Sequence, residues 1–255
     1  MIESLKVSII TVCFNSERTI EDTLISVSGQ SYQNIEHIVV DGASTDSTLS
    51  ILRVHADRIA HLISEPDLGI YDAMNKGIAL ASGNVIGFLN ADDVFARKDS
   101  IEKVVTAFER NSAVAVYGDL VYVRGENLDA IVRLWRSGKF SPAKLKFGWM
   151  PPHPTFYVRN ELVTLVGNFD TSFRIAADYD FILRCLSRKD LPVVYVPDIL
   201  VRMRAGGASN RSVMAVLRKS QEDYRALRKN RIGGWFTLVC KNFRKVFQFF
   251  DRSKI

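Results

Sequence analysis

Two adjacent carboxylates stand at the end of a predicted strand, in the motif Asn-Ala-Asp-Asp at residues 90–93. Asp92 and Asp93, with the amide oxygen of Asn90 beside them, suit a hard divalent cation that also binds a diphosphate. Mg²⁺ keeps several water ligands and takes only one or two protein carboxylates, so a short motif is sufficient. The alternative is a solvated turn that caps the next helix, and the motif alone does not decide between the two.

Three further polar clusters follow apolar runs earlier in the chain, at residues 15–17, 41–46 and 65–67. The carboxyl ends of neighbouring parallel strands meet at one edge of a sheet, and ligands bind there in open α/β sheets. We therefore expect all these clusters, together with residues 90–93, to form one site rather than scattered loops.

The elements that would position this site alternate between strand and helix over the first 118 residues. Apolar, β-branched runs predict strands over Val7–Cys13, Ile35–Val40, Ala60–Ser64, Val85–Leu89 and Val114–Gly118. Helical spacing predicts helices over residues 17–30, 70–81 and 99–110. This alternation predicts an α/β fold with a mostly parallel sheet flanked by helices.

The chain beyond residue 118 follows a different pattern. A hairpin is predicted near Val121–Val132, and the proline-rich stretch 151–154 forces an extended break. Helical patterns return over 211–230 and 235–250. We therefore expect one domain over residues 1–205, made of the halves 1–118 and 119–205, and a helical C-terminal region over 206–255.

Five motifs stand in order along the chain. They are Ser-Ile-Ile-Thr-Val-Cys-Phe-Asn at 8–15, Val-Val-Asp-Gly-Ala-Ser-Thr-Asp at 39–46, Glu-Pro-Asp-Leu-Gly-Ile-Tyr-Asp-Ala-Met-Asn-Lys-Gly at 65–77, Asn-Ala-Asp-Asp at 90–93, and Gly-Asn-Phe-Asp at 167–170 followed by Ala-Asp-Tyr-Asp-Phe-Ile-Leu-Arg at 177–184. Over roughly residues 5–205 this series resembles the family 2 glycosyltransferases, with the GT-A nucleotide-sugar-binding fold. It is similar to the bacterial exopolysaccharide, colanic-acid and O-antigen enzymes of that family.

The resemblance implies donor-binding residues near the ends of the first strands. Thr11, Asn15 and Glu17 match the edge that contacts the donor nucleotide. Asp41 matches the family's aspartate after the second strand, which is expected to accept a hydrogen bond from the uracil or ribose. A turn residue before Gly42, or a helix cap, is the alternative role for Asp41.

The third motif departs from the family in one place. Asp67 stands where relatives often carry asparagine, and it is also expected to touch the base. The family usually has Arg-Asn in the next helix, whereas this chain has Met74 and Asn75. A phosphate-facing cation is therefore missing, and Lys76 is the candidate substitute, although a lysine on a helix surface is usually just solvated.

The metal motif also departs from the family, because Asn90 stands at its first position. An asparagine keeps an oxygen ligand but loses a charge. Asp92 and Asp93 keep the carboxylate pair, so the resemblance implies Mg²⁺ or Mn²⁺ as cofactor. Asp93 is expected to be the more direct ligand, and Asp92 is expected on the donor side as well.

A general base is implied by the family's acidic dipeptide, whose aspartate deprotonates the acceptor hydroxyl. The matching pair here is Ala177-Asp178, so only Asp178 remains. A carboxylate about 3 Å from a sugar hydroxyl can take its proton as the new C–O bond forms. One base and one displacement imply inversion at the anomeric carbon. A helix cap is the alternative role for Asp178.

Four further residues are candidates for the acceptor and diphosphate side. His153, next to prolines, would line the acceptor site or be structural, and Asp180 is a structural or acceptor-side carboxylate. Arg202 and Arg204, with the loop at 206–209, would close over the diphosphate, since arginine and backbone N–H groups both suit phosphate. A flexible linker is the competing interpretation of that loop.

Composition bounds these interpretations. Of the 255 residues 47% are hydrophobic and 24% charged, which is typical of a globular protein and excludes wholesale disorder. The three cysteines are far apart, so neither a zinc site nor a disulfide framework is expected, and a reducing compartment is the simpler interpretation. No run of about 18 apolar residues predicts a transmembrane helix. The apolar start is better explained as a first strand than as a signal peptide.

Charge is concentrated at the C-terminus. Residues 202–255 hold 14 Lys/Arg and 3 Asp/Glu, against 20 and 25 in residues 1–201. Such asymmetry predicts an anionic partner for the tail. In a helix over 235–250 an aromatic arc lies opposite a basic face that includes Lys241 and Arg244, while Leu238 belongs to the arc. This predicts an interfacial helix on an anionic membrane. Packing on the protein's own core, or on a second subunit in a homodimer, is the alternative.

The leading hypothesis is therefore an inverting, metal-dependent glycosyltransferase that moves a sugar from a nucleotide sugar, with UDP favoured, to a polyprenyl-diphosphate-linked saccharide of a bacterial surface polysaccharide. It would be cytoplasmic and peripheral on the inner face of the cell membrane. A sugar nucleotidyltransferase is the alternative enzyme, but residues 11–18 lack the Gly-rich basic loop that it needs. A nucleic-acid-binding protein would explain the tail but not the acidic motifs of the body, so no nucleic acid is expected.

Overall fold

The computed structural model describes residues 4–125, 127–188, 191–206 and 213–247. Its strands are β1 (Val7–Cys13), β2 (Ile35–Asp41), β3 (His61–Ser64), β4 (Val85–Phe88), β5 (Asp93–Phe95), β6 (Ala115–Arg124), β7 (Asn127–Trp135), β8 (Tyr157–Arg159) and β9 (Val193–Arg204). Its α-helices are α1 (Ile20–Ser28), α2 (Thr48–Val54), α3 (Ile70–Leu80), α4 (Ser100–Asn111), α5 (Pro142–Leu145), α6 (Asn160–Val166), α7 (Ala177–Leu186), α8 (Val213–Lys229) and α9 (Trp235–Phe247). These strands and helices confirm the predicted α/β alternation of the first half and the hairpin after it.

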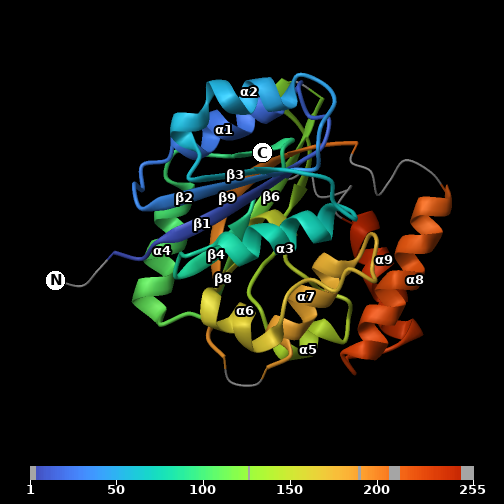
Figure 1. The fold of residues 1–255 in the computed structure, drawn as a ribbon. Coiled ribbons are helices and arrows are strands. Elements are labelled where there is room, and N and C mark those ends of the chain that lie inside the picture. The colour runs from blue at the N-terminus through green and yellow to red at the C-terminus, as the bar shows by residue number, and fades with distance from the viewer. Residues whose placement is uncertain (1–3, 126, 189–190, 207–212, 248–255) are drawn as a thin grey trace.

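One sheet runs through the molecule in the order β3-β2-β1-β4-β8-β6-β9-β5, with β7 paired to β6 (Figure 1). Strands β1 to β4 are parallel, as expected. The second half adds antiparallel pairings, of β8 with β4 and β6 and of β5 with β9. The sheet is therefore mixed, and its parallel half is the part that positions the strand-end clusters.

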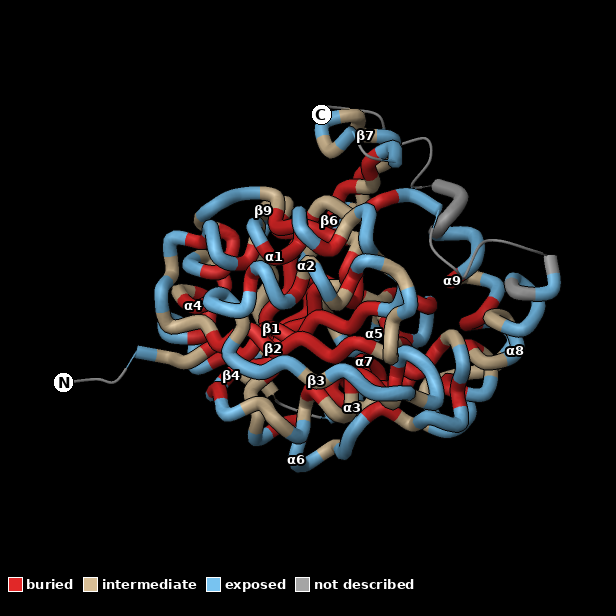
Figure 2. The backbone as a smooth tube through the Cα atoms, turned by 45° about the horizontal axis from the view of Figure 1, so that its top comes forward, coloured by how far each residue is buried: buried red, intermediate tan, exposed pale blue. Residues whose placement is uncertain are grey.

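Side chains alternate along each buried strand, so each strand contributes apolar residues to both faces of the sheet. Ile10, Val12, Ile38 and Val40 face the core that includes side chains of α3, α6 and α7. Val39 faces the opposite side, where a smaller cluster holds residues of α1 and α2. Figure 2 shows the central strands as the most completely buried part of the chain. A sheet buried on both faces leaves only its edges and strand ends open to ligands.

Helices α8 and α9 pack beside α7 and share the main core through Leu227 and Leu238 (Figure 1). Lys241 of α9 is 4% exposed and forms an ion pair with buried Asp223 of α8 at 2.6 Å. Its Nζ atom also lies 3.2 Å from the centre of the Tyr179 ring in α7. The prediction that Lys241 lies on an exposed basic face and Leu238 in an outward apolar arc was therefore wrong: both point into the protein.

Four other predicted members of the arc, Trp235, Phe236, Val239 and Phe243, do face outward. Trp235 and Phe236 are each 67% exposed, and Phe243 is 61% exposed. The part of the predicted arc beyond residue 247 lies outside the described residues. Within the described ranges, no helix combines the length and the apolar character that a membrane span requires.

Candidate active site

The ends of β1, β2 and β3 meet, as the parallel register requires. Cys13 pairs with Asp41, and Asp41 pairs with Ser64. The fully buried Asp41 carboxylate accepts hydrogen bonds from the Ser64 hydroxyl at 2.7 Å and from the Ser44 backbone N–H at 3.1 Å, and the Ser44 hydroxyl donates to it as well. Asp41 thus fixes the loop after β2 at the edge where the donor is expected.

Asn15 and Glu17 connect the loop after β1 to the loop after β2. The Asn15 side-chain oxygen accepts the Thr45 N–H at 2.9 Å, and the Glu17 carboxylate accepts the Ser47 N–H at 3.0 Å. Both residues remain exposed and belong to the expected edge. Thr11 does not: it is fully buried and its hydroxyl lies 3.0 Å from His37 Nε2. The expected contact between Thr11 and the nucleotide is thereby contradicted.

Asp67 lies against the turn at Gly42, and a Cβ atom on that glycine would sit 2.4 Å from Asp67 Oδ2. The two aspartates Asp41 and Asp67 therefore flank one turn, with Asp67 the more exposed. Lys76 is less favourably placed than expected. Its ammonium group contacts Glu65 at 2.8 Å and the Pro66 carbonyl at 2.9 Å, so it is engaged at the start of α3 rather than free for a phosphate.

The metal motif lies between β4 and β5, with its two carboxylates in different environments. Asp92 is partly exposed, whereas Asp93 is fully buried. Burial, and then the charge of Asp92, raises the pKa of Asp93 well above its usual range. Asp92 is therefore the more accessible carboxylate, and the ranking of Asp93 as the more direct ligand stays a prediction.

Oxygen atoms in this motif fit a cation. Among the described residues, Asn90 Oδ1 and Asp93 Oδ1 are buried with no hydrogen-bond partner. No group of three or more His, Cys, Asp or Glu side chains suited to a metal lies within the described ranges. A cation here would thus draw its other ligands from water and a diphosphate, which is the manner of Mg²⁺.

The two arginines predicted to close over the diphosphate have separate roles. Arg204 is 6% exposed, donates to the Asp92 carbonyl at 2.8 Å and forms an ion pair with Asp22 at 2.5 Å, so it is fixed beneath the metal motif. Arg202 instead pairs with Asp129 of β7 at 2.6 Å and is not part of the site. Residues 207–209 of the predicted closing loop lie outside the described residues.

The predicted base, Asp178, lies in the first turn of α7 and is partly exposed. Its Oδ1 atom accepts hydrogen bonds from the Tyr179 N–H at 2.8 Å and from the Tyr71 hydroxyl at 3.3 Å. No described residue donates to Oδ2, which leaves that oxygen available for a substrate proton. Tyr71 has a single hydroxyl proton, which it shares between the Ile175 carbonyl at 2.7 Å and the more distant Asp178 Oδ1, so it contacts both the carboxylate and the loop before it.

Sequence reasoning assigned no role to two side chains of α3 that connect it to this loop. Tyr71 is the first, and Asn75, four residues later on the same helix face, is the second. The Asn75 amide exchanges two hydrogen bonds of 2.9 Å with the backbone of Phe169. The i, i+4 spacing of two polar side chains within the 65–77 motif was the signal that could have identified them.

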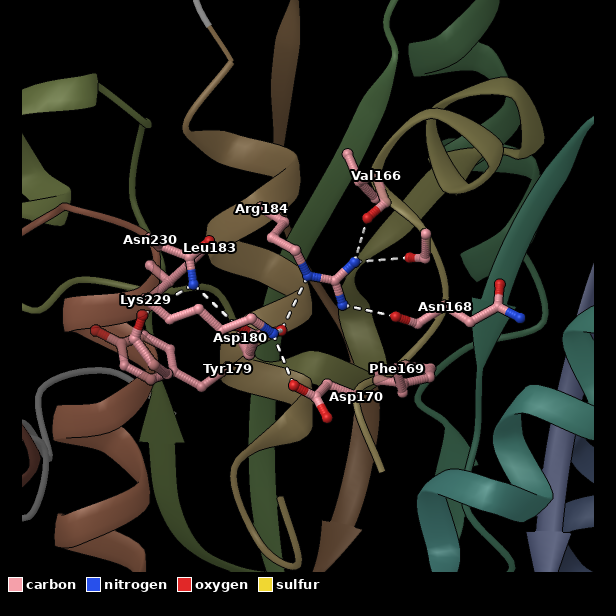
Figure 3. Close-up of polar contacts among 12 residues, drawn as sticks. Val166, Asn168, Phe169, Asp170, Tyr179, Asp180, Leu183, Arg184, Lys229 and Asn230 are labelled. Atoms are coloured by element: carbon pink, nitrogen blue, oxygen red, sulfur yellow. Dashed lines mark hydrogen bonds and ion pairs between the residues drawn. The ribbon is translucent and has the colours of Figure 1, made fainter. Parts of the chain in front are cut away.

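Asp180 is part of a buried polar network. Its fully buried carboxylate lies 2.9 Å from Arg184 and 3.1 Å from Lys229, and accepts a hydrogen bond from Asn230 at 2.9 Å (Figure 3). Arg184 in turn donates to backbone carbonyls of the 166–168 turn (Figure 3). This network joins α7 to α8 and supports the structural alternative for Asp180 over the acceptor-side one.

His153 is also part of the core. It is 8% exposed, and its ring stacks on Phe88 with centroids 5.1 Å apart. Phe169 meets the same ring edge-on at 5.7 Å. Burial lowers the pKa of His153. The structure thus supports the alternative of a structural histidine beneath the site over a direct acceptor contact.

A family model described as Glycosyl transferase family 2 matches residues 8–175. The chain belongs to this family. This confirms the resemblance and decides for a glycosyltransferase over a nucleotidyltransferase. An uncharacterized glycosyltransferase of Mycobacterium tuberculosis is 38% identical over 183 residues, which cover 70% of this chain and 68% of the relative. A PGL/p-HBAD biosynthesis glycosyltransferase of Mycobacterium bovis is 32% identical over 208 residues, with 80% and 78% covered.

Solved structures support the GT-A fold of this glycosyltransferase. Residues 1–349 of Staphylococcus aureus TarS superpose with a TM-score of 0.68 at 18% identity, over 89% of this chain and 64% of that one. This chain therefore spans less than two thirds of that TarS structure. The mannosyltransferase PcManGT of Pyrobaculum calidifontis, in complex with GDP-Man and Mn²⁺, gives 0.67 at 21% identity, over 95% and 70%.

Proposed function

We propose that this glycosyltransferase moves a sugar from a nucleotide sugar, preferentially a UDP-sugar, to a hydroxyl group of a lipid-linked saccharide, with inversion and with Mg²⁺ or Mn²⁺ as cofactor. The observation that carries the proposal is the contact between Tyr71 and Asp178, because it couples the candidate base to the helix that follows the donor-side strands. The neighbours TarS and PcManGT, solved with UDP-GlcNAc and with GDP-Man and Mn²⁺, support a nucleotide-sugar donor and a divalent cation.

Asp178 carries the proton transfer in this proposal. Its Oδ2 takes the proton of the acceptor hydroxyl while that oxygen bonds to the anomeric carbon. The bond from this carbon to the diphosphate oxygen breaks in the same displacement, so the configuration inverts and a nucleoside diphosphate leaves. Tyr71 and the Tyr179 N–H occupy Oδ1 and keep Oδ2 in position.

The donor side depends on charge. Asp92, with the oxygens of Asn90 and Asp93 that have no partner among the described residues, would hold a divalent cation, which would supply positive charge to the leaving diphosphate. Arg204 supports the same motif through its bond to the Asp92 carbonyl, with its charge shared with Asp22. Asp67, the more accessible of the two aspartates at the Gly42 turn, is the proposed contact for the uracil or ribose, and the buried Asp41 holds the loop on the other side of that turn.

The exposed face of α9 supports membrane attachment, which would bring the enzyme to a lipid-linked acceptor on the inner face of the cell membrane. Trp235, Phe236 and Phe243 form this face, and Phe147 joins it through an edge contact with Phe236 at 6.1 Å. The nearby side chains of Lys146 and Arg244 are exposed and basic. An aromatic face bordered by cations is what binding to an anionic lipid surface requires.

The test is release of nucleoside diphosphate from UDP-, GDP- and dTDP-sugars, with a synthetic farnesyl-diphosphate-linked sugar as acceptor, in Mg²⁺, Mn²⁺ or EDTA. We expect metal-dependent release, and a loss of about 10²–10⁴-fold in Asp178→Asn with donor binding retained. The matched control is Asp57→Asn, because Asp57 is an exposed carboxylate in the short turn of helix that follows α2. Near wild-type turnover in Asp178→Asn, or release that EDTA leaves unchanged, would overturn the corresponding part of the proposal.

A further inference from the structure

A basic pocket of about 470 Å³ opens between α8 and the loop that leads into α7, away from the donor-side motifs. It is lined by Ser172, Arg174, Arg218, Gln221, Glu222 and Arg225. The residues of α8 in this lining are spaced i, i+3, i+4 and i+7, so they form one face of the helix. Three arginines and one glutamate give the pocket a positive charge.

The single carboxylate of the pocket does not neutralise the arginines. Glu222 accepts hydrogen bonds from the backbone N–H groups of Arg174, Ile175 and Ala176 at 2.8–3.1 Å. Its negative charge is therefore directed at the loop backbone. Within the described part of the chain, neither guanidinium group of Arg174 or Arg218 has an ion pair, and both side chains are exposed.

The third arginine is held in place. Arg225 donates to the hydroxyl of Ser172, and its guanidinium carbon lies 4.3 Å from the centre of the Phe173 ring. One fixed guanidinium beside two unpaired ones is an arrangement that suits an anion with several oxygens. Arginine binds phosphate groups through two parallel N–H donors, so the chemistry of the pocket favours a phosphate or diphosphate.

The pocket lies beside the candidate base. Arg174 and Asp178 are four residues apart, so their Cα atoms are within about 14 Å even for an extended chain. Ile175, next to Arg174, is fixed by Tyr71, the residue that also contacts Asp178. An anion held in the pocket would thus be close to the point where an acceptor hydroxyl loses its proton.

The helix that lines the pocket, α8, also packs against α9, which carries the exposed aromatic face (Figure 1). The Tyr224 ring of α8 stacks on the Trp235 ring of α9 with centroids 4.5 Å apart. A molecule with an apolar tail, a diphosphate and a sugar could therefore engage the aromatic face, the arginine pocket and Asp178 in that order.

We propose that Arg174, Arg218 and Arg225 bind the diphosphate of a lipid-linked acceptor. This inference takes the lipid-linked acceptor from the proposed function. Binding of a lipid diphosphate to the pocket can nevertheless be measured without any sugar transfer. An anionic phospholipid headgroup offers the same phosphate chemistry, and the two sources must be separated by experiment.

The test is calorimetric titration of the full chain with farnesyl diphosphate, with farnesol as the uncharged probe and no nucleotide sugar present. We expect the double variant Arg174→Gln/Arg218→Gln to weaken farnesyl diphosphate binding at least about 10-fold, since each loses a charge-assisted hydrogen bond. Arg228→Gln, an exposed arginine of the same helix that does not line the pocket, is the matched control and should change binding less than twofold. Farnesol binding should be the same in all variants.

Equal binding of farnesyl diphosphate by the wild type and the double variant, or none by the wild type, overturns the proposal. Loss in the double variant of binding to phosphatidylglycerol vesicles, with farnesyl diphosphate binding intact, assigns the pocket to a headgroup and also overturns it. The proposed function fails separately, if no nucleotide sugar is turned over by the wild type. Turnover with the farnesyl-diphosphate-linked acceptor that the double variant leaves unchanged would leave the function standing and remove this inference.

Discussion

The Glu222 carboxylate in α8 accepts the backbone N–H of Ile175 at 2.8 Å, three residues before the candidate base. The same carboxylate also binds the N–H groups on either side, those of Arg174 and Ala176. From the other side, Tyr71 of α3 donates to the Ile175 carbonyl. The base loop is therefore held between the nucleotide-binding half and the C-terminal helices, which makes α8 part of the site's support.

Replacing Glu222 tests this support. Glu222→Ala removes the acceptor of the exposed Arg174 N–H and of the partly buried N–H groups of Ile175 and Ala176. Each partly buried loss costs on the order of 1–3 kcal/mol unless water replaces the acceptor. We expect kcat to fall about 10-fold or more while the KM for the donor stays within about twofold, because the donor side is not touched. Glu222→Gln keeps one acceptor oxygen and should recover part of kcat. Glu161→Ala, an exposed glutamate of α6, is the control. Unchanged kcat in Glu222→Ala would remove the positioning role.

Asp180 should matter for stability instead. Asp180→Asn removes the negative charge that Arg184 and Lys229 share, at a fully buried position. We expect a loss of about 2–3 kcal/mol in the free energy of unfolding, below the value for a fully buried pair because Lys229 is 39% exposed. Urea unfolding measures this loss. A large fall in kcat with no change in unfolding free energy would instead give Asp180 an acceptor-side role.

The first turn of α7 also explains why the sequence pointed to two carboxylates there but could not tell the candidate base from the structural residue. Asp178 and Asp180 are two residues apart, and therefore about 200° apart around the helix. One of them must face away from the core if the other faces it. The helical pattern gives this opposition, but which of the two is buried depends on Arg184, Lys229 and Asn230. Lys229 is the last residue of α8 and Asn230 follows it, about 50 residues later in the chain.

Elsewhere in the chain, too, the features that depend on local sequence could be predicted, and those that depend on distant partners could not. The parallel strands and their polar ends follow from local apolar runs, so residues 41–46 and 90–93 were correctly brought to one edge. Strands β5 and β8 pair antiparallel with segments distant in the chain, and β9 pairs parallel with β6, and no local pattern records these pairings. Lys241 was misplaced because a helical projection ranks it as polar and outward, whereas its partner Asp223 buries it.

The buried His37 predicts a pH dependence of stability. Burial lowers the pKa of His37 to about 4 from its ordinary 6.5. Between these values the unfolded chain takes up a proton that the folded protein does not, so stability falls as the pH drops through this window and is constant above it. The total effect is at most about 3 kcal/mol.

The measurement compares the unfolding free energy of wild type and His37→Gln from pH 8 to pH 4. We expect the wild type to lose more stability on acidification than the variant, by as much as about 1.4 kcal/mol per pH unit below pH 6.5. The difference between the two proteins at pH 8 serves as the reference, since His37 is neutral there in both states. Parallel curves across the window would show that His37 does not titrate differently on folding.

The last prediction concerns the outward aromatic face of α9. A membrane-binding helix needs such a face to be exposed, whereas a helix that packs inside the protein would bury it. Phe236→Ser/Phe243→Ser removes two rings that are 67% and 61% exposed, so folding should be little affected. Burial of apolar area in the lipid interface is then lost, at roughly 25 cal/mol per Å². We expect flotation with vesicles that contain phosphatidylglycerol to fall several-fold.

The matched control is Val54→Ser/Leu165→Ser, which removes two apolar side chains that are 79% and 59% exposed on α2 and α6, distant from α9 in the sequence. It should float as the wild type does. Raising the salt concentration should weaken wild-type flotation only in part, because Lys146 and Arg244 supply an attraction that salt screens while the aromatic contribution remains. If neither the wild type nor the double variant floats, and sedimentation shows a dimer that Phe236→Ser/Phe243→Ser dissociates, the face belongs to a second copy of the chain. Membrane attachment through α9 would then be wrong, while the base and donor assignments would be unaffected.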